Sequence, residues 1–431
     1  MKKTVSLFLI LICTIIISAV SVSAQEYTLN TEFHNKYMDG AGDGRFNPDG
    51  NVTRAQMCQI IYNLLNAKPE IVKTFDDVYE NDWYYDSVNS LYSAGFVNGK
   101  YTDTEFCPND LISRGETIDL ICKFYELLDC TSEFSDVEPD SKFYGAISNA
   151  YKNGWINGFD DGTFRPGSPI TRAELATVLN NVLNRDADRE FIKANDRVRI
   201  FVDVEPEHWA YYDITEATVH HTHEITNGEK WLTYTWEKTG LPSGYHMINH
   251  YLYYVEEETG QFAVNTSVKN RYFNERGRYT TGHSELDKNL HEVIQGICIN
   301  EPQNESNLES VYFYVRDNFV YQARQHVPKG ATDWELKYAE PMMRSHYGNC
   351  YSWASVFMYL TRWIGFDTRC QSGTTGKSNN AHGWTEINFN GEWFIFDPEM
   401  ENSSRKAGNK SFHKRYYKLP YNNSIRSYVT Y

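Results

Sequence analysis

Three residues in the C-terminal part of the chain have side chains that could together perform acyl transfer. Cys350 is a candidate nucleophile, His382 a candidate base and Asp397 a carboxylate that could orient the imidazole. A thiol, an imidazole and a carboxylate are the groups that activate a cysteine for attack on a carbonyl carbon. The elements between them must therefore bring the three side chains together.

The sequence after Cys350 predicts an amphipathic helix. Apolar residues recur three and four positions apart, and Gly365 follows as a stop signal. Cys350 then lies in the first turn, where the positive end of the helix dipole favours the thiolate.

His382 and Asp397 lie on two alternating segments that predict a β-hairpin. Asn390-Gly391 separates the segments, and this pair is the one most favoured in a two-residue hairpin loop. Counting back from that loop makes His382 and Asp397 diagonal neighbours on one face of the ribbon. The same register places Glu399 directly opposite His382, so Glu399 is an alternative orienting acid.

Residues 308–398 resemble the transglutaminase-like superfamily of papain-type cysteine enzymes. The resemblance rests on a helix expected over 308–319 and on three ordered motifs: Gly-x-Cys ending at Cys350, His-x-Trp starting at His382, and Trp-x-x-x-Asp-Pro containing Asp397. It implies that Cys350 attacks an amide carbonyl, His382 shares and returns the proton, and Asp397 holds the imidazole.

The backbone N–H of Cys350 would donate a hydrogen bond to the oxyanion, and Trp334 or Tyr338 is the candidate for the second hydrogen-bond donor. The alternative is a buried core thiol and an ordinary strand histidine. In that case the domain keeps the fold for binding or assembly at the surface and is not an enzyme.

The chain has 431 residues, enough for two or three domains, and a formal net charge of −16. Nearly all of the net negative charge lies in residues 25–219, which hold 17 Lys and Arg against 34 Asp and Glu. Residues 220–431 are almost neutral, with 22 Lys and Arg against 23 Asp and Glu. The negative electrostatic potential that this excess of Asp and Glu creates disfavours nucleic acid and anionic membranes as partners. No oligomeric state follows from the sequence.

Residues 1–24 predict a signal peptide. Two lysines precede an apolar run, and Val22-Ser23-Ala24 has the small-x-small pattern of a cleavage site. Seven cysteines remain after cleavage, an odd number that leaves at least one free thiol, which we assign to Cys350. The other six predict reduced packing residues. Their spacing indicates no zinc site, and we expect no cofactor.

The N-terminal half is an internal repeat. Units are expected at about 39–66, 75–128 and 134–183, with a closing half-unit at 201–219 that supplies the opening half the first unit lacks. Arg54, Arg114 and Arg172 recur at equivalent positions 60 and 58 residues apart. We expect the closing half-unit to pack against the first unit.

These units resemble S-layer homology (SLH) modules, whose Thr-Arg-Ala-Glu signature is intact at 171–174. The resemblance implies an all-α, pseudo-threefold domain over 25–219 that binds secondary cell-wall polysaccharide in a Gram-positive-type envelope. The three arginines would pair with acidic groups of the glycan, while Trp83 and Trp209 offer sugar-stacking or packing surfaces. The alternative for each arginine is helix capping and a structural ion pair.

Residues 220–283 predict a β-rich spacer of short aromatic hairpins, and 284–431 the α+β catalytic core, with closing strands after Asp397. His220, His221 and His223 could bind a metal, but the pattern favours an exposed helix end. The prediction is therefore an exported, wall-anchored, multidomain α+β protein. Its substrate is a peptide or protein amide, and resolution of the thioester by water is favoured over crosslinking to an amine.

Overall fold

A computed structural model describes residues 27–195, 198, 201–226, 228–235, 238–377, 380–408, 413–423 and 425–431. Among the described residues, two compact units are present: those within 27–40, 46–191 and 203–235 form one, and those within 41–45, 192–202 and 236–431 the other. The predicted signal peptide lies outside the described residues. Within the described part, no helix combines the length and apolar character needed to span a membrane.

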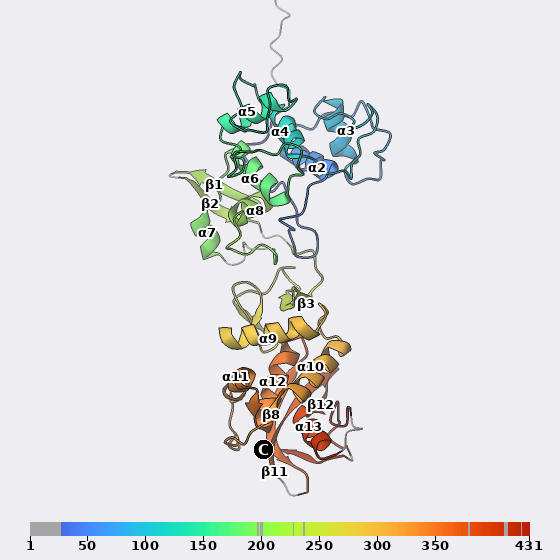
Figure 1. Cartoon of the computed structure of the whole chain (residues 1–431), viewed down its shortest axis with the longest axis vertical. Coiled ribbons are helices and arrows are strands. Elements are labelled where there is room, and N and C mark those ends of the chain that lie inside the picture. Colours follow the sequence, from blue (N-terminus) through green and yellow to red (C-terminus); the bar gives the residue numbers. More distant parts are fainter. Residues whose placement is uncertain are drawn as a thin grey trace, which may run out of the picture. The chain divides into compact units, whose positions relative to one another are not determined.

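The N-terminal unit contains three helix pairs (Figure 1), each joining the closing helix of one repeat to the opening helix of the next. The pairs are α2 (Arg54–Leu64) with α3 (Tyr85–Ser93), α4 (Arg114–Cys122) with α5 (Tyr144–Lys152), and α6 (Arg172–Leu183) with α8 (Tyr211–Thr218). A short helix, α7 (Arg189–Ala194), lies between α6 and α8. The helices α2, α4 and α6 each start with a complete capping box, which satisfies the first free N–H groups of the helix.

The three repeats are joined by a closed ring of backbone hydrogen bonds. Val52 N–H donates to Ile170 O (3.0 Å), Ile170 N–H to Ile112 O (3.3 Å), and Ile112 N–H to Val52 O (3.0 Å). The closing half-unit reaches the first repeat through Asp203, whose carboxylate accepts the N–H groups of Phe46 and Asn47 at 2.8 and 2.7 Å. Its helix α8, in contrast, packs on α6.

The region after α8 consists of short antiparallel strands. The hairpin β1 (His221–Ile225) with β2 (Glu229–Tyr234) groups with the N-terminal unit, so that unit holds strands as well as helices. The first strands of the second unit are β3 (Gly244–Ile248), β4 (Tyr251–Val255), β5 (Thr266–Val268), β6 (Arg271–Phe273) and β7 (Tyr279–Thr280).

The C-terminal core is built around one buried helix, α12 (Cys350–Trp363). It packs against α9 (Ser284–Ile297), α10 (Glu305–Asn318) and α11 (Glu335–Ser345), and against a four-stranded sheet ordered β12-β11-β10-β13 (Figure 1). The strands are β10 (Thr368–Thr375), β11 (Asn380–Phe389), β12 (Glu392–Phe396) and β13 (Tyr428–Thr430). A two-stranded parallel pair, β8 (Val320–Tyr321) and β9 (Tyr347–Gly348), precedes α12, and α13 (Pro398–Lys406) follows β12.

Candidate functional site

Cys350 is the first residue of α12. Asn349 caps the helix, since its side-chain oxygen accepts the N–H of Ser352 at 3.2 Å. Cys350 is 5% exposed and packs with Trp334, Tyr338 and other residues. The cap fixes the thiol at the end of the helix where free N–H groups and the helix dipole favour negative charge.

The sheet brings His382 to this helix end. Thr385 Oγ1 in β11 donates to the carbonyl of Ala354 in α12 at 2.8 Å, which fixes the strand on the helix. Gly383 permits the close approach, because a Cβ there would lie 2.6 Å from Cδ1 and 3.1 Å from Cα of Tyr351. His382 consequently lies close enough to the Cys350 thiol for the thiol to raise the pKa of the imidazole.

Asp397 lies on the other side of the imidazole. Its Oδ2 is 2.7 Å from His382 Nε2, so Nδ1 is the ring nitrogen left for the thiol. Oδ1 accepts the N–H of Met400 at 3.0 Å, because Asp397 is also the N-cap of α13. The Tyr428 hydroxyl donates to Oδ2 at 2.8 Å. The structure therefore brings the three predicted residues together, and the acid is held from three directions.

Electrostatics favour a protonated His382. Burial would lower the pKa of the imidazole, but the negative charge of Asp397, its hydrogen bond and the Cys350 thiol together raise the pKa of His382 well above its ordinary value. The same carboxylate acts on Tyr428, where burial first and then Asp397 raise the pKa of the phenol. An imidazolium between a thiol and a carboxylate is the arrangement of an activated cysteine.

The prediction that Glu399 lies across the hairpin from His382 is wrong. The loop register is as expected, with Phe389 paired to Glu392, but β12 ends at Phe396 and Pro398 starts α13. Glu399 thus occupies the first turn of a helix, where burial and the neighbouring Asp397 raise the pKa of its carboxyl group. The closing strand expected after Asp397 is β13, which pairs with β10, but nine residues first form α13, a helix that the sequence did not predict.

The two candidates for the second oxyanion donor differ in their contacts. The Tyr338 hydroxyl donates to the carbonyl of Gln325 at 2.7 Å and is therefore occupied. Trp334 is 9% exposed and packs edge-on against Tyr351, next to the thiol.

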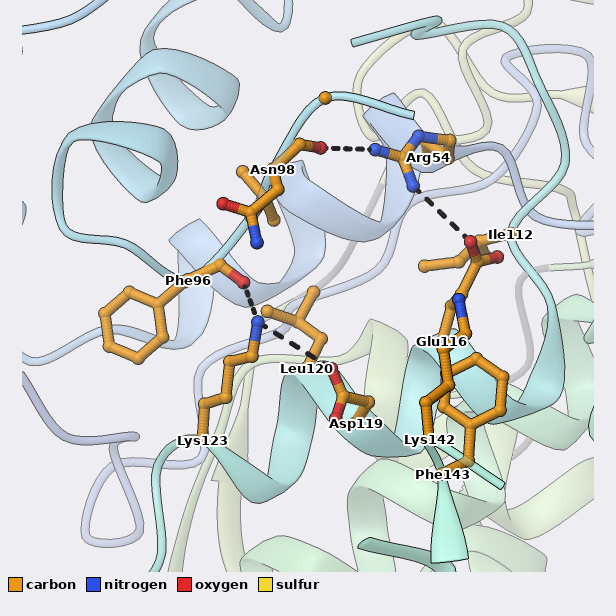
Figure 2. Close-up of a pocket in the computed structure, with 12 residues that line it drawn as sticks. Arg54, Phe96, Asn98, Ile112, Glu116, Asp119, Leu120, Lys123, Lys142 and Phe143 are labelled. Atoms are coloured by element: carbon orange, nitrogen blue, oxygen red, sulfur yellow. Dashed lines mark hydrogen bonds and ion pairs between the residues drawn. The ribbon is translucent and has the colours of Figure 1, made fainter. Parts of the chain in front are cut away.

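The three arginines of the repeats are held by hydrogen bonds to backbone carbonyls, and Arg54 and Arg114 also line cavities. Nε of Arg54 donates to the carbonyl of Phe106 at 2.9 Å and one Nη to Asn98 at 2.9 Å, while Glu116 lies 3.8 Å from the other. Figure 2 shows Arg54 and Glu116 on one wall of a cavity of about 350 Å³, with Lys123 opposite. Arg54 and Arg114 are each 8% exposed, so only part of each guanidinium remains available.

A second cavity of about 200 Å³ repeats this arrangement one unit further along. Arg114 donates to Phe164 O and to Glu174, both at 2.9 Å, and Trp209 lines the same cavity. Arg172 makes the corresponding contact with Phe46 O at 2.8 Å. Trp83 and Trp209 are both 62% exposed, so neither is a core residue.

The structure confirms the prediction of unpaired cysteines and corrects the prediction for the histidines at 220–223. All seven cysteines of the described residues are unpaired, as expected. The interpretation of 220–223 as an exposed helix end is wrong, because β1 begins at His221 and the ring of His221 is buried against Trp231 with ring centroids 3.8 Å apart.

Comparisons with known proteins agree with this division of the chain. The S-layer homology domain family matches residues 34–58, 74–118 and 133–176, and the transglutaminase-like superfamily matches 291–398. The cellulosome-anchoring protein of Acetivibrio thermocellus is 30% identical over 209 residues, 46% of this chain and 45% of that protein. The surface-layer 125 kDa protein of Lysinibacillus sphaericus is 33% identical over 35% of this chain and 13% of its own length.

The chain thus spans less than half the length of these relatives. The crystal structure of a "Putative Cysteine Protease" from Cytophaga hutchinsonii covers 26% of this chain and 37% of its own, at 19% identity and a TM-score of 0.20, too low to support an argument. The SLH repeats and the surface proteins that share them indicate an exported, cell-wall-associated protein. The chain carries three S-layer homology repeats at its N-terminus and a domain of the transglutaminase-like superfamily at its C-terminus.

Proposed function

We propose that the C-terminal domain is a cysteine amidase or peptidase that acts on peptide or protein substrates of the cell envelope. The observation that carries the proposal is the bond of 2.7 Å between His382 Nε2 and Asp397 Oδ2, with the Cys350 thiol as the next partner of the imidazole. The charges of Cys350, His382 and Asp397, their burial and their order along the chain then match the requirements of a thiol nucleophile, a base and an orienting acid.

In the proposed reaction the Cys350 thiolate attacks the amide carbon and the His382 imidazolium gives its proton to the leaving amine. The C–N bond breaks and a thioester remains on Sγ. Neutral His382 then takes a proton from water, whose oxygen attacks the thioester and releases the acid and the thiol. Asp397 keeps the imidazole in place throughout. An amine in place of water would give a crosslink, and the pocket decides between the two acceptors.

The experiment is mass spectrometry of envelope peptides incubated with the wild type and with Cys350→Ala. Cleaved peptides, one mass of water heavier in sum than their parent, should form with the wild type only. Joined peptides that have lost ammonia would identify an acyltransferase. No Cys350-dependent product of either kind would refute the catalytic assignment.

The second candidate is a surface protein that uses the same domain for binding without turnover. The observation that favours it is burial, since Cys350 and His382 are each only 5% exposed. In that case wild type and Cys350→Ala would leave all peptides intact and retain the same ones on the protein.

We further propose that the repeats form a pseudo-threefold anchor that binds secondary cell-wall polysaccharide in the two described cavities and a third, equivalent one. The closed ring of hydrogen bonds and the repeated arginine contacts support this arrangement. Trp209→Ala should weaken sedimentation of the full chain with purified sacculi, because the exposed indole would stack on sugar beside Arg114. Tyr101→Ala is the matched control, since Tyr101 is 72% exposed and outside both cavities.

A further inference from the structure

Four ionisable side chains from separate parts of the N-terminal unit meet at one buried point. His34 precedes the first repeat, Glu216 lies in α8, His221 in β1 and Glu229 in β2. Their exposed fractions are 4%, 0%, 8% and 6%, respectively. Burial of two carboxylates and two imidazoles at one point requires compensation of their charge.

The side-chain atoms are spaced like the corners of a small tetrahedron. His34 Nδ1 lies 2.9 Å from Glu229 Oε1, 3.1 Å from His221 Nε2 and 3.2 Å from Glu216 Oε1. His221 Nε2 lies 3.0 Å from Glu229 Oε1 and 3.4 Å from Glu216 Oε1. A tetrahedral ion with metal–ligand bonds of about 2.0–2.1 Å holds its ligand atoms roughly 3.3–3.4 Å apart. Five of the six edges therefore have nearly the length that such an ion requires.

The hydrogen bonds around the cluster direct lone pairs into it. His221 Nδ1 is 3.1 Å from the carbonyl oxygen of Val219, which can only accept, so Nδ1 carries the proton. In the neutral ring Nε2 then presents a lone pair to the carboxylates of Glu216 and Glu229. Among the described residues, neither carboxylate oxygen of Glu216 has a hydrogen-bond partner, although Oε1 lies 3.2 Å from His34 Nδ1 and 3.4 Å from His221 Nε2.

Neighbouring groups fix the ligands in place. Trp231 Nε1 donates to Glu229 Oε1 at 3.1 Å. Arg185 is 5% exposed and donates to the carbonyls of Phe33 and Asn35, both at 3.0 Å, which holds the segment that carries His34. Hydrogen bonds of this kind orient the ligands of protein metal sites.

We propose that His34, Glu216, His221 and Glu229 bind one divalent transition-metal ion of the Zn²⁺ type. Two imidazoles and two carboxylates suit Zn²⁺ better than Ca²⁺ or Mg²⁺, which prefer oxygen ligands alone. Four protein ligands close the coordination sphere, so the site is structural. The ion joins the segment before the first repeat to α8 and to the β1–β2 hairpin. His223, whose ring stacks on His34 with centroids 3.7 Å apart, has a ring nitrogen within 4.8 Å of the ligand atoms of His34, His221 and Glu229 and borders this site.

The test is the zinc content of the full chain after incubation with Zn²⁺ and exhaustive dialysis. Glu216→Gln removes one ligand charge without changing size, so it should still fold, and it should hold about one zinc less per chain than the wild type. His34→Ala should behave likewise, while His283→Ala, at an exposed histidine of the other unit, should hold as much as the wild type. Because every variant keeps the seven cysteines, the difference excludes thiol-bound zinc.

Two further measurements separate the metal site from its alternative, an imidazolium paired with the carboxylates. Zinc should raise the Tm of the wild type but not that of Glu216→Gln. X-ray absorption is measured on the Cys350→Ala variant, which lacks the reactive thiol. The zinc in this variant should have nitrogen and oxygen neighbours at about 2.0 Å and no sulfur neighbour at about 2.3 Å. Equal zinc in wild type and Glu216→Gln, no zinc-dependent Tm, or a sulfur shell would each overturn the proposal.

Discussion

Replacing Asp397 by asparagine should remove the charge that keeps His382 protonated. The two side chains are 6% and 1% exposed and 2.7 Å apart, so solvent screens their attraction little. With charge centres about 4 Å apart and an effective dielectric constant of about 20, the attraction is about 4 kcal/mol. Loss of that energy would reduce the imidazolium population by roughly 10³-fold, and a remaining neutral hydrogen bond would moderate the loss to about 10²-fold or more.

The assay is the rate at which iodoacetamide alkylates Cys350, followed by peptide mass spectrometry between pH 5.5 and 9. In the wild type the imidazolium stabilises the thiolate, so alkylation should remain fast at pH 6.5. In Asp397→Asn it should fall by about 10²-fold at that pH, because an ordinary thiol is only about 1% ionised there. Cys130, which is partly exposed in the other unit, is the internal control and should react equally in both proteins.

Equal alkylation rates at pH 6.5 in wild type and Asp397→Asn would refute this reasoning. Equal rates would mean that the carboxylate does not set the charge state of the imidazole. A change in the alkylation rate of Cys130 between the two proteins would indicate general unfolding and not a local effect, because unfolding exposes this partly buried thiol, and circular dichroism would confirm it.

Three further predictions follow from the contacts of the site. Gly383→Ala should reduce the rate of acyl transfer by about 10²-fold in a kinetic assay, because the new Cβ would lie 2.6 Å from Cδ1 of Tyr351 and displace the strand. Gly296→Ala is the control and should leave the rate unchanged, because its new Cβ would have no neighbour within 4 Å. Tyr428→Phe should lower the urea-derived free energy of unfolding by about 1.5–3 kcal/mol, since it removes a buried hydrogen bond to a charged oxygen; an unchanged midpoint would contradict this. Because the pKa of His382 is raised, its stabilising ion pair with Asp397 is complete below pH 6.5 and is lost as the pH rises through the folded-state pKa. The difference in free energy of unfolding between wild type and His382→Gln should therefore become smaller as the pH rises. A difference that becomes larger would contradict this assignment.

The reactive residues were predictable because their geometry is set locally. Asn390-Gly391 determines the hairpin register, which makes His382 and Asp397 neighbours, and the apolar spacing after Cys350 determines the helix, whereas the meeting of helix and hairpin is implied only by the resemblance to transglutaminase-like enzymes. The alternating pattern predicts Glu399 on the hairpin, but Pro398 ends the strand and starts a helix.

Other contacts had no local signal. Tyr428 reaches Asp397 across 31 residues, and His34 meets His221 across 187, so neither pairing leaves a pattern within one element. The exposure of Trp83 and Trp209 likewise depends on how the repeats pack. Periodicity and turn chemistry predict elements and registers, whereas contacts between distant elements require the folded chain.

The most direct measurement of the central claim is acylation of the thiol itself. The full chain is mixed with p-nitrophenyl acetate, release of nitrophenolate is followed, and the acetylated peptide is identified by mass spectrometry. A nucleophilic Cys350 should give a burst of about one nitrophenolate per chain, with the acetyl group on Cys350, and no burst should occur in Cys350→Ala or His382→Ala. Acetyl groups spread over several cysteines, or a burst that survives either substitution, would contradict this claim.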